Sequence, residues 1–485
     1  MRLRKIRRLS PLLSAKLQKK VSLQFDRQNR LKNIVMLLLF TAGVEHLDLL
    51  REKTFFLFEA AWQYAQFCWL VFGKMTRGQV WVFFLPALAL DAVRYYVTNI
   101  LVLLMEIGKI LLPRTKNRRN WWKPPLVSVI LPVYNEAGRI EKTINSIREN
   151  KYPKLEIIVV DDGSTDTTAA VCADYARKGL IRYIRKTERG GKASALNYGF
   201  RLAKGEFIVH FDAEVRVSRT AIREGLLPFQ DPRVGVVSGN VKVLNDRESL
   251  AVRLQAAEYG IAISVQRRWL SLVNSLRIAS GAFSVFRREA LEKTMGLDPE
   301  TGDDLDITLK IRKLGYKVVF APAAVVWTHV PASFYRLFRQ RIRWDACYIR
   351  LNLRKHGNPA YCRQFSWADF INYALDLVFN IILLLVYPIY IVLILGFVPQ
   401  LLICFLIVPY IFYTLMNIIQ LGIVTVLSDD WKRDGLLILY APLMMFYYLL
   451  LNGERVVAYF LETFRLRYLR DGFYPQKVWD NMPRY

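Results

Sequence analysis

Two apolar blocks, near residues 54–112 and 376–461, flank a more polar centre in this chain of 485 residues. Each block contains stretches close to the roughly 20 residues that a helix needs to cross the hydrocarbon of a bilayer. The chain is also too long for one compact domain. It therefore predicts a central domain inserted between membrane helices, which we expect near 54–73, 80–112, 376–395, 400–427 and 436–461.

Basic residues predict the orientation of these helices. The net charge is +28, eight Lys or Arg and no acid fall within residues 1–20, and five fall within 114–123 around Trp121 and Trp122. Cations and Trp beside apolar segments indicate contact with anionic lipid, so we expect a lipid membrane and no nucleic acid as partner. The positive-inside rule then predicts a multi-pass protein of the cell membrane with a cytoplasmic central domain.

The C-terminal tail conflicts with this rule. Three C-terminal crossings would place it outside, yet it carries Arg465, Arg467 and Arg470. Either one apolar run is re-entrant or the tail is an exception. The expected parts are a basic and interfacial segment (1–53), about two membrane helices (54–112), a basic linker (113–124), a central domain (125–332), an amphipathic interface helix (333–358), about three membrane helices (359–461) and a tail (462–485).

Two smaller features bear on the setting of the protein. The five cysteines are scattered and odd in number, which predicts free thiols rather than a metal or disulfide framework. The basic start has no adjacent apolar run, so we expect no cleavable signal peptide.

The central domain alternates between strand and helix patterns. Apolar, β-rich runs predict strands at 126–133, 156–160, 181–185 and 206–211, and helical spacing predicts helices at 138–149, 165–177 and 192–203. Continuously apolar strands between helices indicate a largely parallel sheet covered on both faces. Ligands of such sheets bind beyond the carboxyl ends of the strands.

Polar motifs follow the first two strands. The first strand ends in Pro132-Val133-Tyr134-Asn135-Glu136, and the second ends in Asp161-Asp162-Gly163-Ser164-Thr165-Asp166. Two adjacent acids can accept hydrogen bonds from a base nitrogen and a ribose hydroxyl. A turn with Ser164 or Thr165 capping the next helix is the alternative, but a cap needs no pair of preceding acids. Nucleotide contact is therefore favoured.

Two further motifs predict charge at the same edge. Gly190-Gly191-Lys192 opens a helix, where glycines allow close backbone approach and the helix start favours anions. Asp212-Ala213-Glu214 closes the fourth strand, and its carboxylates suit Mg²⁺ or Mn²⁺, which would neutralise a departing diphosphate. An exposed acidic turn is an equally good interpretation of the second motif taken alone.

The last two motifs carry acids and aromatic residues. Asp303-Asp304-Leu305-Asp306 leads a helix, where acids are tolerated for dipole reasons, but one carboxylate there can also take a proton from an attacking hydroxyl. Gln340-Arg341-Ile342-Arg343-Trp344 lies in a basic, aromatic stretch typical of an interfacial helix. Arg343 can approach a diphosphate there, and Trp344 offers a flat face to a sugar ring.

These motifs, in this order and between membrane segments, resemble the membrane-bound family 2 glycosyltransferases, which include cellulose, chitin, hyaluronan and poly-N-acetylglucosamine synthases. The similarity covers about residues 125–350, and Gln-x-x-Arg-Trp is its most specific element. It implies an α/β GT-A fold (Rossmann-like, with a mostly parallel sheet), a UDP-sugar donor, a glycan acceptor, a divalent metal (Mg²⁺ or Mn²⁺) and an inverting mechanism.

The resemblance also implies roles for single residues. Asp304 matches the family's catalytic base, and Asp212 with Glu214 matches its metal motif, in which the second acid is usually Asp. Asp303 stands where the family usually has Glu. The remaining substrate contacts implied by the resemblance are Pro132, Tyr134, Glu136, Asp161, Asp162, Lys192, Asp212, Gln340, Arg343 and Trp344. The loosely matching Ser280-Gly281-Ala282-Phe283 falls where relatives line the acceptor site.

The predicted function is transfer of sugar from a UDP-sugar to a growing polysaccharide, coupled to its export. Two alternatives stay open. One is a non-processive transferase that adds one sugar to a lipid-linked acceptor. The other is an inactive scaffold or channel subunit that kept the fold, for which the departures at Asp303 and Glu214 leave room.

Overall fold

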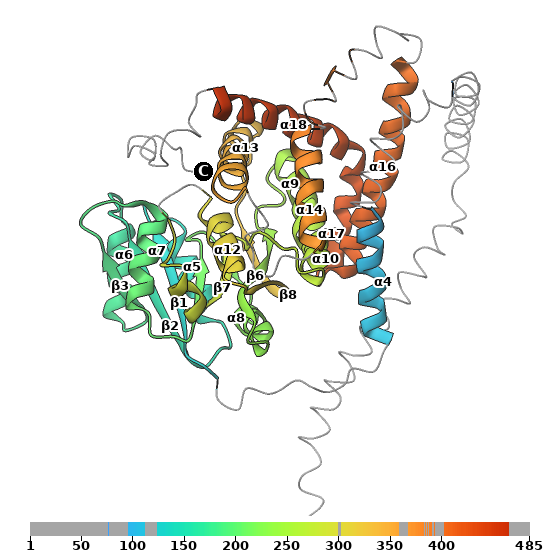
Figure 1. The fold of residues 1–485 in the computed structure, drawn as a ribbon. Coiled ribbons are helices and arrows are strands. Elements are labelled where there is room, and N and C mark those ends of the chain that lie inside the picture. The colour runs from blue at the N-terminus through green and yellow to red at the C-terminus, as the bar shows by residue number, and fades with distance from the viewer. Residues whose placement is uncertain are drawn as a thin grey trace, which may run out of the picture. The chain divides into compact units, whose positions relative to one another are not determined.

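The computed structural model describes residues 76, 96–111, 124–298, 302–357, 367–382, 384, 386, 388–389, 392 and 402–464 (Figure 1). The chain divides into two compact units, Met1–Val80 and Trp81–Tyr485, and every described residue except Thr76 belongs to the second. The expectations for residues 1–53, for a helix near 54–73, for the linker up to residue 123 and for the tail beyond residue 464 lie outside the described residues.

One mixed sheet organises the described central domain. Its eight strands lie in the order β3-β2-β1-β4-β7-β6-β8-β5. Their bounds are β1 Val127–Val133, β2 Leu155–Asp161, β3 Arg182–Arg185, β4 Phe207–Phe211, β5 Arg216–Val217, β6 Val234–Val243, β7 Phe283–Arg287 and β8 Lys317–Thr328. The four strands predicted from the sequence are β1 to β4, and they pair in parallel as expected.

The other half of the sheet differs from a purely parallel arrangement. Strand β7 pairs antiparallel with both β4 and β6, and β5 pairs antiparallel with β8, whereas β6 and β8 are parallel. The α/β, mostly parallel fold is therefore confirmed in its first half, and β7 is the strand that reverses direction in the middle of the sheet.

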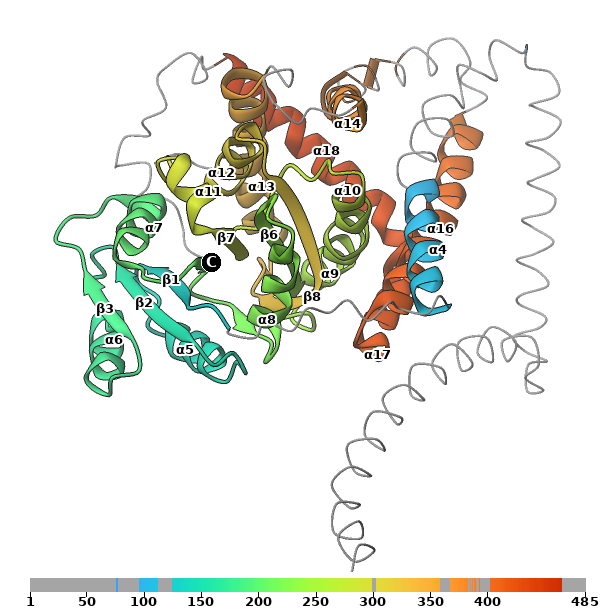
Figure 2. The ribbon, with the colours of Figure 1, turned by 60° about the horizontal axis from the view of Figure 1, so that its bottom comes forward.

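Helices cover both faces of the sheet (Figures 1 and 2). Those of the central domain are α5 Ile140–Arg148, α6 Thr168–Arg177, α7 Gly191–Leu202, α8 Ala221–Leu226, η3 Leu227–Gln230, α9 Leu250–Tyr259, the π-helix η4 Gly260–Gln266, α10 Arg267–Leu272, α11 Arg288–Lys293, α12 Asp303–Lys313, α13 Phe334–Tyr348 and the π-helix η5 Ile349–Lys355. The three helices predicted from the sequence correspond to α5, α6 and α7.

Alternating side chains of the strands form a core on each face. Val129 and Leu131 of β1 pack into one cluster with α5, α6 and α8, and Ile130 packs into the other with α7, α11 and α12. This period of two is the signature of a strand with both faces buried. Fully buried side chains such as Phe207 each contribute roughly 1.5–3 kcal/mol relative to exposure, so the sheet is a rigid base for the loops at its edge.

A third cluster joins the central domain to the helices that follow and precede it. These helices are α4 Thr98–Leu111, α14 Trp367–Leu377, the π-helix η7 Val378–Ile382, α16 Leu402–Leu427, α17 Trp431–Gly435, η9 Leu436–Tyr440 and α18 Ala441–Phe464. Val102 of α4, Val265 of η4, Leu337 of α13 and Met444 of α18 are all buried in this cluster. The apolar blocks recognised in the sequence thus partly pack on the central domain.

Two segments of the described residues are long and apolar enough to cross a membrane. They are Pro409–Leu427 and Trp431–Phe464, each with a mean hydropathy of 1.7. They cover two of the three C-terminal runs predicted from the sequence. The first predicted C-terminal run, 376–395, is described only in part, and so is the predicted N-terminal helix at 80–112, of which α4 is the described portion.

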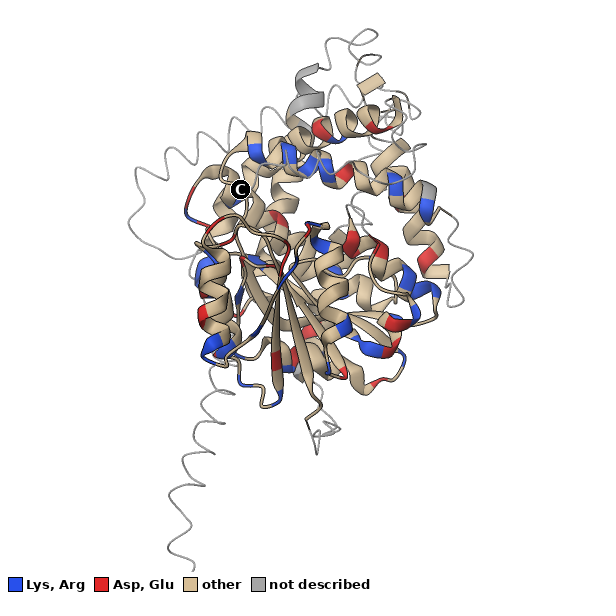
Figure 3. Ribbon diagram, turned by 90° about the vertical axis from the view of Figure 1, so that its left-hand side faces the viewer, with Lys and Arg blue, Asp and Glu red and all other residues tan. Residues whose placement is uncertain are grey.

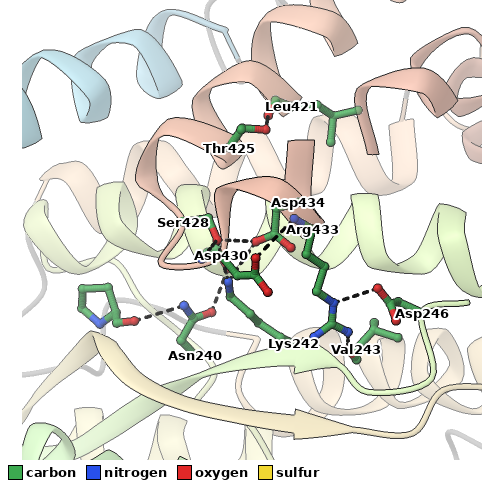
Figure 4. A network of polar contacts seen from close by, with 12 residues as sticks. Asn240, Lys242, Val243, Asp246, Leu421, Thr425, Ser428, Asp430, Arg433 and Asp434 are labelled. Atoms are coloured by element: carbon green, nitrogen blue, oxygen red, sulfur yellow. Dashed lines mark hydrogen bonds and ion pairs between the residues drawn. The ribbon is translucent and has the colours of Figure 1, made fainter. Parts of the chain in front are cut away.

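Ionic contacts attach the turn between these two segments to strand β6 (Figure 4). The ammonium of Lys242 donates to Asp434 Oδ2 and to Ser428 Oγ, each at 2.9 Å. Arg433 donates from Nε to Asp246 Oδ2 at 2.7 Å and from Nη2 to the carbonyl of Val243. The turn after α16 is therefore held on the central domain.

Gly239 of β6 offers a test of how tightly the sheet packs. A Cβ at Gly239 would overlap the ring of Phe283 on β7, whereas a Cβ at Gly138 would meet no atom within 4 Å. We expect Gly239→Ala to cost about 1–3 kcal/mol of stability through overpacking. Thermal unfolding of the purified protein measures this, with Gly138→Ala as the control, and equal midpoints for the two variants would contradict the packing.

Candidate active site

The loops that follow β1, β2 and β4 leave the sheet at one edge, because these strands are parallel neighbours. Acidic and basic residues are intermingled at the upper end of the strands in the view of Figure 3. The parallel topology thus explains why motifs about 30 to 80 residues apart in the sequence meet, as expected for this class of sheet.

Hydrogen bonds hold the first two loops together. The backbone N–H of Asn135 donates to Ser164 Oγ at 2.9 Å, and the N–H of Thr165 donates to the side-chain oxygen of Asn135 at 2.8 Å. The N–H of Glu136 donates to Thr168 Oγ1 at 2.8 Å. Asn135 adopts a φ of 52°, a conformation that Asn tolerates better than most residues. The loop conformation is therefore set by polar side chains of the second motif.

Asp161 and Asp162 are buried and already bind neighbouring groups. Asp161 accepts from the N–H of Ser164 and from the hydroxyl of Tyr183, at 2.8 and 2.7 Å. Asp162 accepts from the N–H groups of Gly190 and Gly191, at 3.0 and 2.7 Å, and pairs with Lys186 at 2.5 Å. In the structure these acids shape the loop after β2 and the loop between β3 and α7, so their predicted nucleotide contact would be added to this structural role.

Tyr134 and Glu136 face cations. The guanidinium carbon of Arg189 lies 4.0 Å from the centroid of the Tyr134 ring. Glu136 Oε2 lies 3.9 Å from Arg139 Nη1. Pro132 is the penultimate residue of β1 and directs this loop out of the sheet. Tyr134 and Glu136, which the sequence predicts as substrate contacts, thus contact two arginines, Arg189 and Arg139, that the sequence did not single out.

The strongest charge cluster surrounds Lys192 at the first turn of α7. Its ammonium lies 2.6 Å from Asp212 Oδ1. Burial alone would lower the pKa of Lys192, but Asp212, Asp303 and Asp304 outweigh burial and hold this pKa above its ordinary value. The structure therefore brings together residues from α7, from the loop after β4 and from the start of α12.

Asp304 belongs to the same cluster of charged side chains. Its Oδ2 accepts from the N–H of Gly281 at 3.3 Å, and a Cβ at Gly281 would lie 3.6 Å from the ammonium of Lys192. Burial raises the pKa of Asp304 to about 6, and the neighbouring Asp303 raises it while Lys192 lowers it. One oxygen of Asp303 is buried without a hydrogen-bond partner among the described residues. A carboxyl in such surroundings is suited to exchange a proton near neutral pH.

Asp212 and Glu214 do not share a partner in the structure. Glu214 Oε2 pairs with Arg139 Nη1 at 2.6 Å, whereas Asp212 pairs with Lys192. Burial raises the pKa of Glu214 to about 7, while Arg139 lowers it. The described residues contain no group of three or more His, Cys, Asp or Glu side chains in reach of one ion.

Among these residues, Asp212 is suited to be a ligand of a divalent ion. Its carboxylate already attracts the cationic Lys192, and carboxylate oxygens are the preferred ligands of Mg²⁺ and Mn²⁺. Glu214 would have to leave Arg139 to join it. Metal binding by both acids remains a prediction, with Asp212 the better placed ligand. His210 is buried, and because burial lowers its pKa to about 3, its ring is neutral. Its Nε2 lies 3.7 Å from Asp212 Oδ1.

Helix α13 carries the predicted Gln340, Arg343 and Trp344. Trp344 is 41% exposed, whereas the side-chain oxygen of Gln340 is buried without a hydrogen-bond partner among the described residues. The helix approaches the start of α12, since a Cβ at Gly302 would lie 3.1 Å from Cβ of Cys347. The motif thus lies on the helix that packs against the acids of α12.

Sequence reasoning missed several polar residues of the site. Arg267 donates to Ser238 Oγ at 2.8 Å, and Ser238 also accepts from the N–H of Ser280, next to Gly281. Burial lowers the pKa of Arg267 to about 10, and Asp304 opposes that shift. The only local signal for Arg267 was a pair of arginines after an apolar stretch, which is equally typical of a membrane-facing helix.

Comparison with known proteins defines the class. Residues 128–295 match the model of Glycosyl transferase family 2. The described structure resembles a mannosyltransferase from Pyrobaculum calidifontis, solved with GDP-Man and Mn²⁺, with a TM-score of 0.51 and 23% identity over 79% of this chain and 99% of the other. Residues 128–295 are therefore similar to glycosyl transferase family 2, and the described structure has a GT-A-like fold.

Individual curated relatives make the resemblance to family 2 more specific. The chain is 30% identical over 220 residues to poly-beta-1,6-N-acetyl-D-glucosamine synthases of Staphylococcus epidermidis and Staphylococcus aureus. The matched region is 45% of this chain and 53% of each relative, so the chain spans about half the length of the curated relatives it matches. The resemblance to the processive synthases of family 2 is thereby confirmed for the central region.

The different surroundings of Asp212 and Glu214 lead to a test of metal binding. We expect Asp212→Asn to weaken Mn²⁺ binding in the presence of UDP by at least about tenfold, because a charged oxygen ligand is lost. Glu214→Gln should have a smaller effect, since burial raises the pKa of Glu214 to about 7 and a protonated carboxyl is a poor metal ligand. Electron paramagnetic resonance of bound Mn²⁺ measures both. Equal losses would show that Glu214 is a full ligand.

Proposed function

We propose that this protein is an inverting glycosyltransferase that moves N-acetylglucosamine from its UDP derivative to the end of a growing polysaccharide. The observation that supports this most is the cluster of Lys192, Asp212 and Asp304 at the edge of a GT-A-like sheet. The identity with poly-beta-1,6-N-acetyl-D-glucosamine synthases supports the choice of sugar. An inactive scaffold would have no need for a buried, proton-exchanging carboxyl beside a cation.

In the proposed reaction, an acceptor hydroxyl attacks the anomeric carbon of the sugar from the face opposite the diphosphate. The ionised carboxylate of Asp304 removes the hydroxyl proton as the bond forms. Lys192, with Arg343 approaching from α13, stabilises the negative charge that grows on the departing UDP. One displacement of this kind inverts the anomeric centre and gives a β-linkage from an α-linked donor.

The metal, when bound, would supply positive charge at the diphosphate, and Asp212 is the residue best placed to hold it. Asp161 and Asp162 would orient the nucleoside, because they fix the loop after β2 and the loop between β3 and α7. Trp344, exposed on α13, would stack on the acceptor end, and Gln340 offers an unpartnered oxygen to a sugar hydroxyl.

A membrane location with the central domain in the cytoplasm completes the proposal. Large apolar side chains of α16 and α18 are exposed, among them Leu415, Phe446 and Phe460, and lipid is the natural solvent for such faces. Export of the polymer between these helices is proposed from the same architecture.

The contacts of α18 favour one answer to the conflict over the tail. Near its start, Tyr447 bonds to Glu258 of the central domain, and near its end Glu462 pairs with Arg350 of η5. A helix that contacts the central domain near both ends keeps residue 464, where the described part of the chain ends, on the side of that domain. The re-entrant alternative therefore fits these contacts better than an exception to the positive-inside rule.

A donor screen tests the function. Purified protein with Mn²⁺ should release UDP from UDP-N-acetylglucosamine faster than from UDP-glucose, and mass spectrometry should find products of many sugars. Addition of one sugar only, to a lipid-linked acceptor, would favour the non-processive alternative. No UDP release from any donor would contradict the proposal.

Replacement of the proposed base is the sharpest mutational test. We expect Asp304→Asn to lower turnover by about 10²–10⁴-fold, because no group remains to take the proton, with UDP affinity nearly unchanged. Wild-type turnover in the variant would contradict the assignment, and loss of UDP affinity would point to misfolding.

The pH profile follows from the raised pKa of Asp304, which is about 6. Only the ionised carboxylate is a base, so turnover should fall about tenfold per pH unit below that value and level off above it. If turnover began to fall only near pH 4, the reacting carboxyl would have an ordinary pKa. That result would contradict the desolvation of Asp304 in the structure.

A further inference from the structure

Arg341 lies inside the Gln340–Trp344 motif but has no part in the proposed reaction. Its side chain is only 13% exposed, and Nη2 donates to Glu258 Oε2 at 2.7 Å. Its guanidinium carbon also lies 4.7 Å from the centroid of the Trp344 ring, three residues further along the same helix. The guanidinium therefore joins the proposed acceptor platform to another element of the fold.

Glu258 connects three helices. It is the penultimate residue of α9, and the same Oε2 atom that accepts from Arg341 on α13 accepts from the hydroxyl of Tyr447 on α18 at 2.6 Å. Tyr447 is 1% exposed. A buried carboxylate held by one cation and one hydroxyl has little freedom, so the direction of the Arg341 guanidinium is fixed from both sides.

The position of Trp344 depends on this arrangement. Its own side chain is 41% exposed, so its rotamer is not set by close packing on all sides. Attraction between a guanidinium and an indole face is worth enough to favour one ring orientation. Cys347, one turn further along α13, contacts Gly302 immediately before Asp303, so the same helix faces the proposed base.

We propose that Glu258, Arg341 and Tyr447 are positioning residues that orient Trp344 toward the acceptor and couple α18 to acceptor binding. This inference rests on the proposed function, because it takes Trp344 as the surface on which the acceptor end stacks. Movement of α18 along the central domain would turn the Trp344 ring through Tyr447 and Glu258, and thereby change how firmly the polymer end is held.

The structure offers a matched control for a merely structural role. Glu462 of α18 accepts from Arg350 at 3.0 and 2.9 Å, and both side chains are buried. On the same helix, the ring of Tyr459 stacks on Tyr348 of α13 at 6.5 Å. These contacts also fasten α18 to the α13–η5 segment, but they do not contact Trp344.

The test uses the full chain with UDP-N-acetylglucosamine as donor and a β-1,6-linked N-acetylglucosamine pentasaccharide as acceptor. The variants are Glu258→Gln and Tyr447→Phe, with Glu462→Gln and Tyr459→Phe as controls. We expect the first two to raise the acceptor KM by about five- to tenfold, to shorten the product, and to leave the donor KM and the acceptor-free hydrolysis of the donor unchanged. The controls should change none of these.

Arg341→Lys adds a discriminating variant. Lys keeps the charge that pairs with Glu258 but lacks the planar guanidinium that stacks on an indole. A positioning role predicts a raised acceptor KM in this variant, whereas a role in fastening the helices predicts wild-type values.

Three results would overturn the inference. They are wild-type acceptor KM and product length in Tyr447→Phe, an equal rise in the control variants, and wild-type behaviour of Arg341→Lys. If Glu258→Gln no longer binds UDP, Tyr447→Phe and Arg341→Lys decide the matter. Failure of the proposed function itself looks different, because the wild-type protein would then release no UDP.

Discussion

The ion pair between Lys192 and Asp212 is the interaction on which the site depends. It joins the first turn of α7 to the loop after β4, and it places one cation among the acids of two other motifs. Without that cation, Asp212, Asp303 and Asp304 would repel one another in a desolvated space. Because a donor diphosphate would compete for the same ammonium, the ion pair both balances the charge of these acids and offers a binding site for an anion.

The sheet makes this pair possible. Parallel neighbours β1, β2 and β4 deliver their loops to one edge, and the reversal at β7 brings Gly281 beneath the acids of α12. Helix α13 then packs on α12 near Gly302 and carries Trp344 to the same region. The C-terminal helices are attached to this frame by ion pairs at β6 and η5 and by a hydrogen bond from Tyr447 to Glu258 of α9, and not by apolar packing alone. The proposed coupling between α18 and acceptor binding uses these contacts.

The sequence predicted the first half of the fold well, because β1 to β4 and α5 to α7 follow simple periodic patterns with polar motifs at the strand ends. It could not predict the antiparallel β7, since pairing direction depends on contacts with distant strands rather than on local pattern. The grouping of Lys192, Asp212 and Asp304 was predictable from motif order. The partners Arg139, Arg267 and Glu258 were not, because a charged residue on an otherwise ordinary helix shows its target only once the chain is folded.

The division between Asp212 and Glu214 is a further case. Two acids one residue apart after a strand suggested one shared ion, but in the structure Asp212 pairs with Lys192 and Glu214 pairs with Arg139. The account therefore centres on Asp212, Lys192 and Asp304 as the reacting core. A structure of the protein with UDP and Mn²⁺ tests it most directly. The account predicts the ion on Asp212 with the diphosphate beside Lys192 and within reach of Asp304, and UDP bound away from these three residues would contradict it.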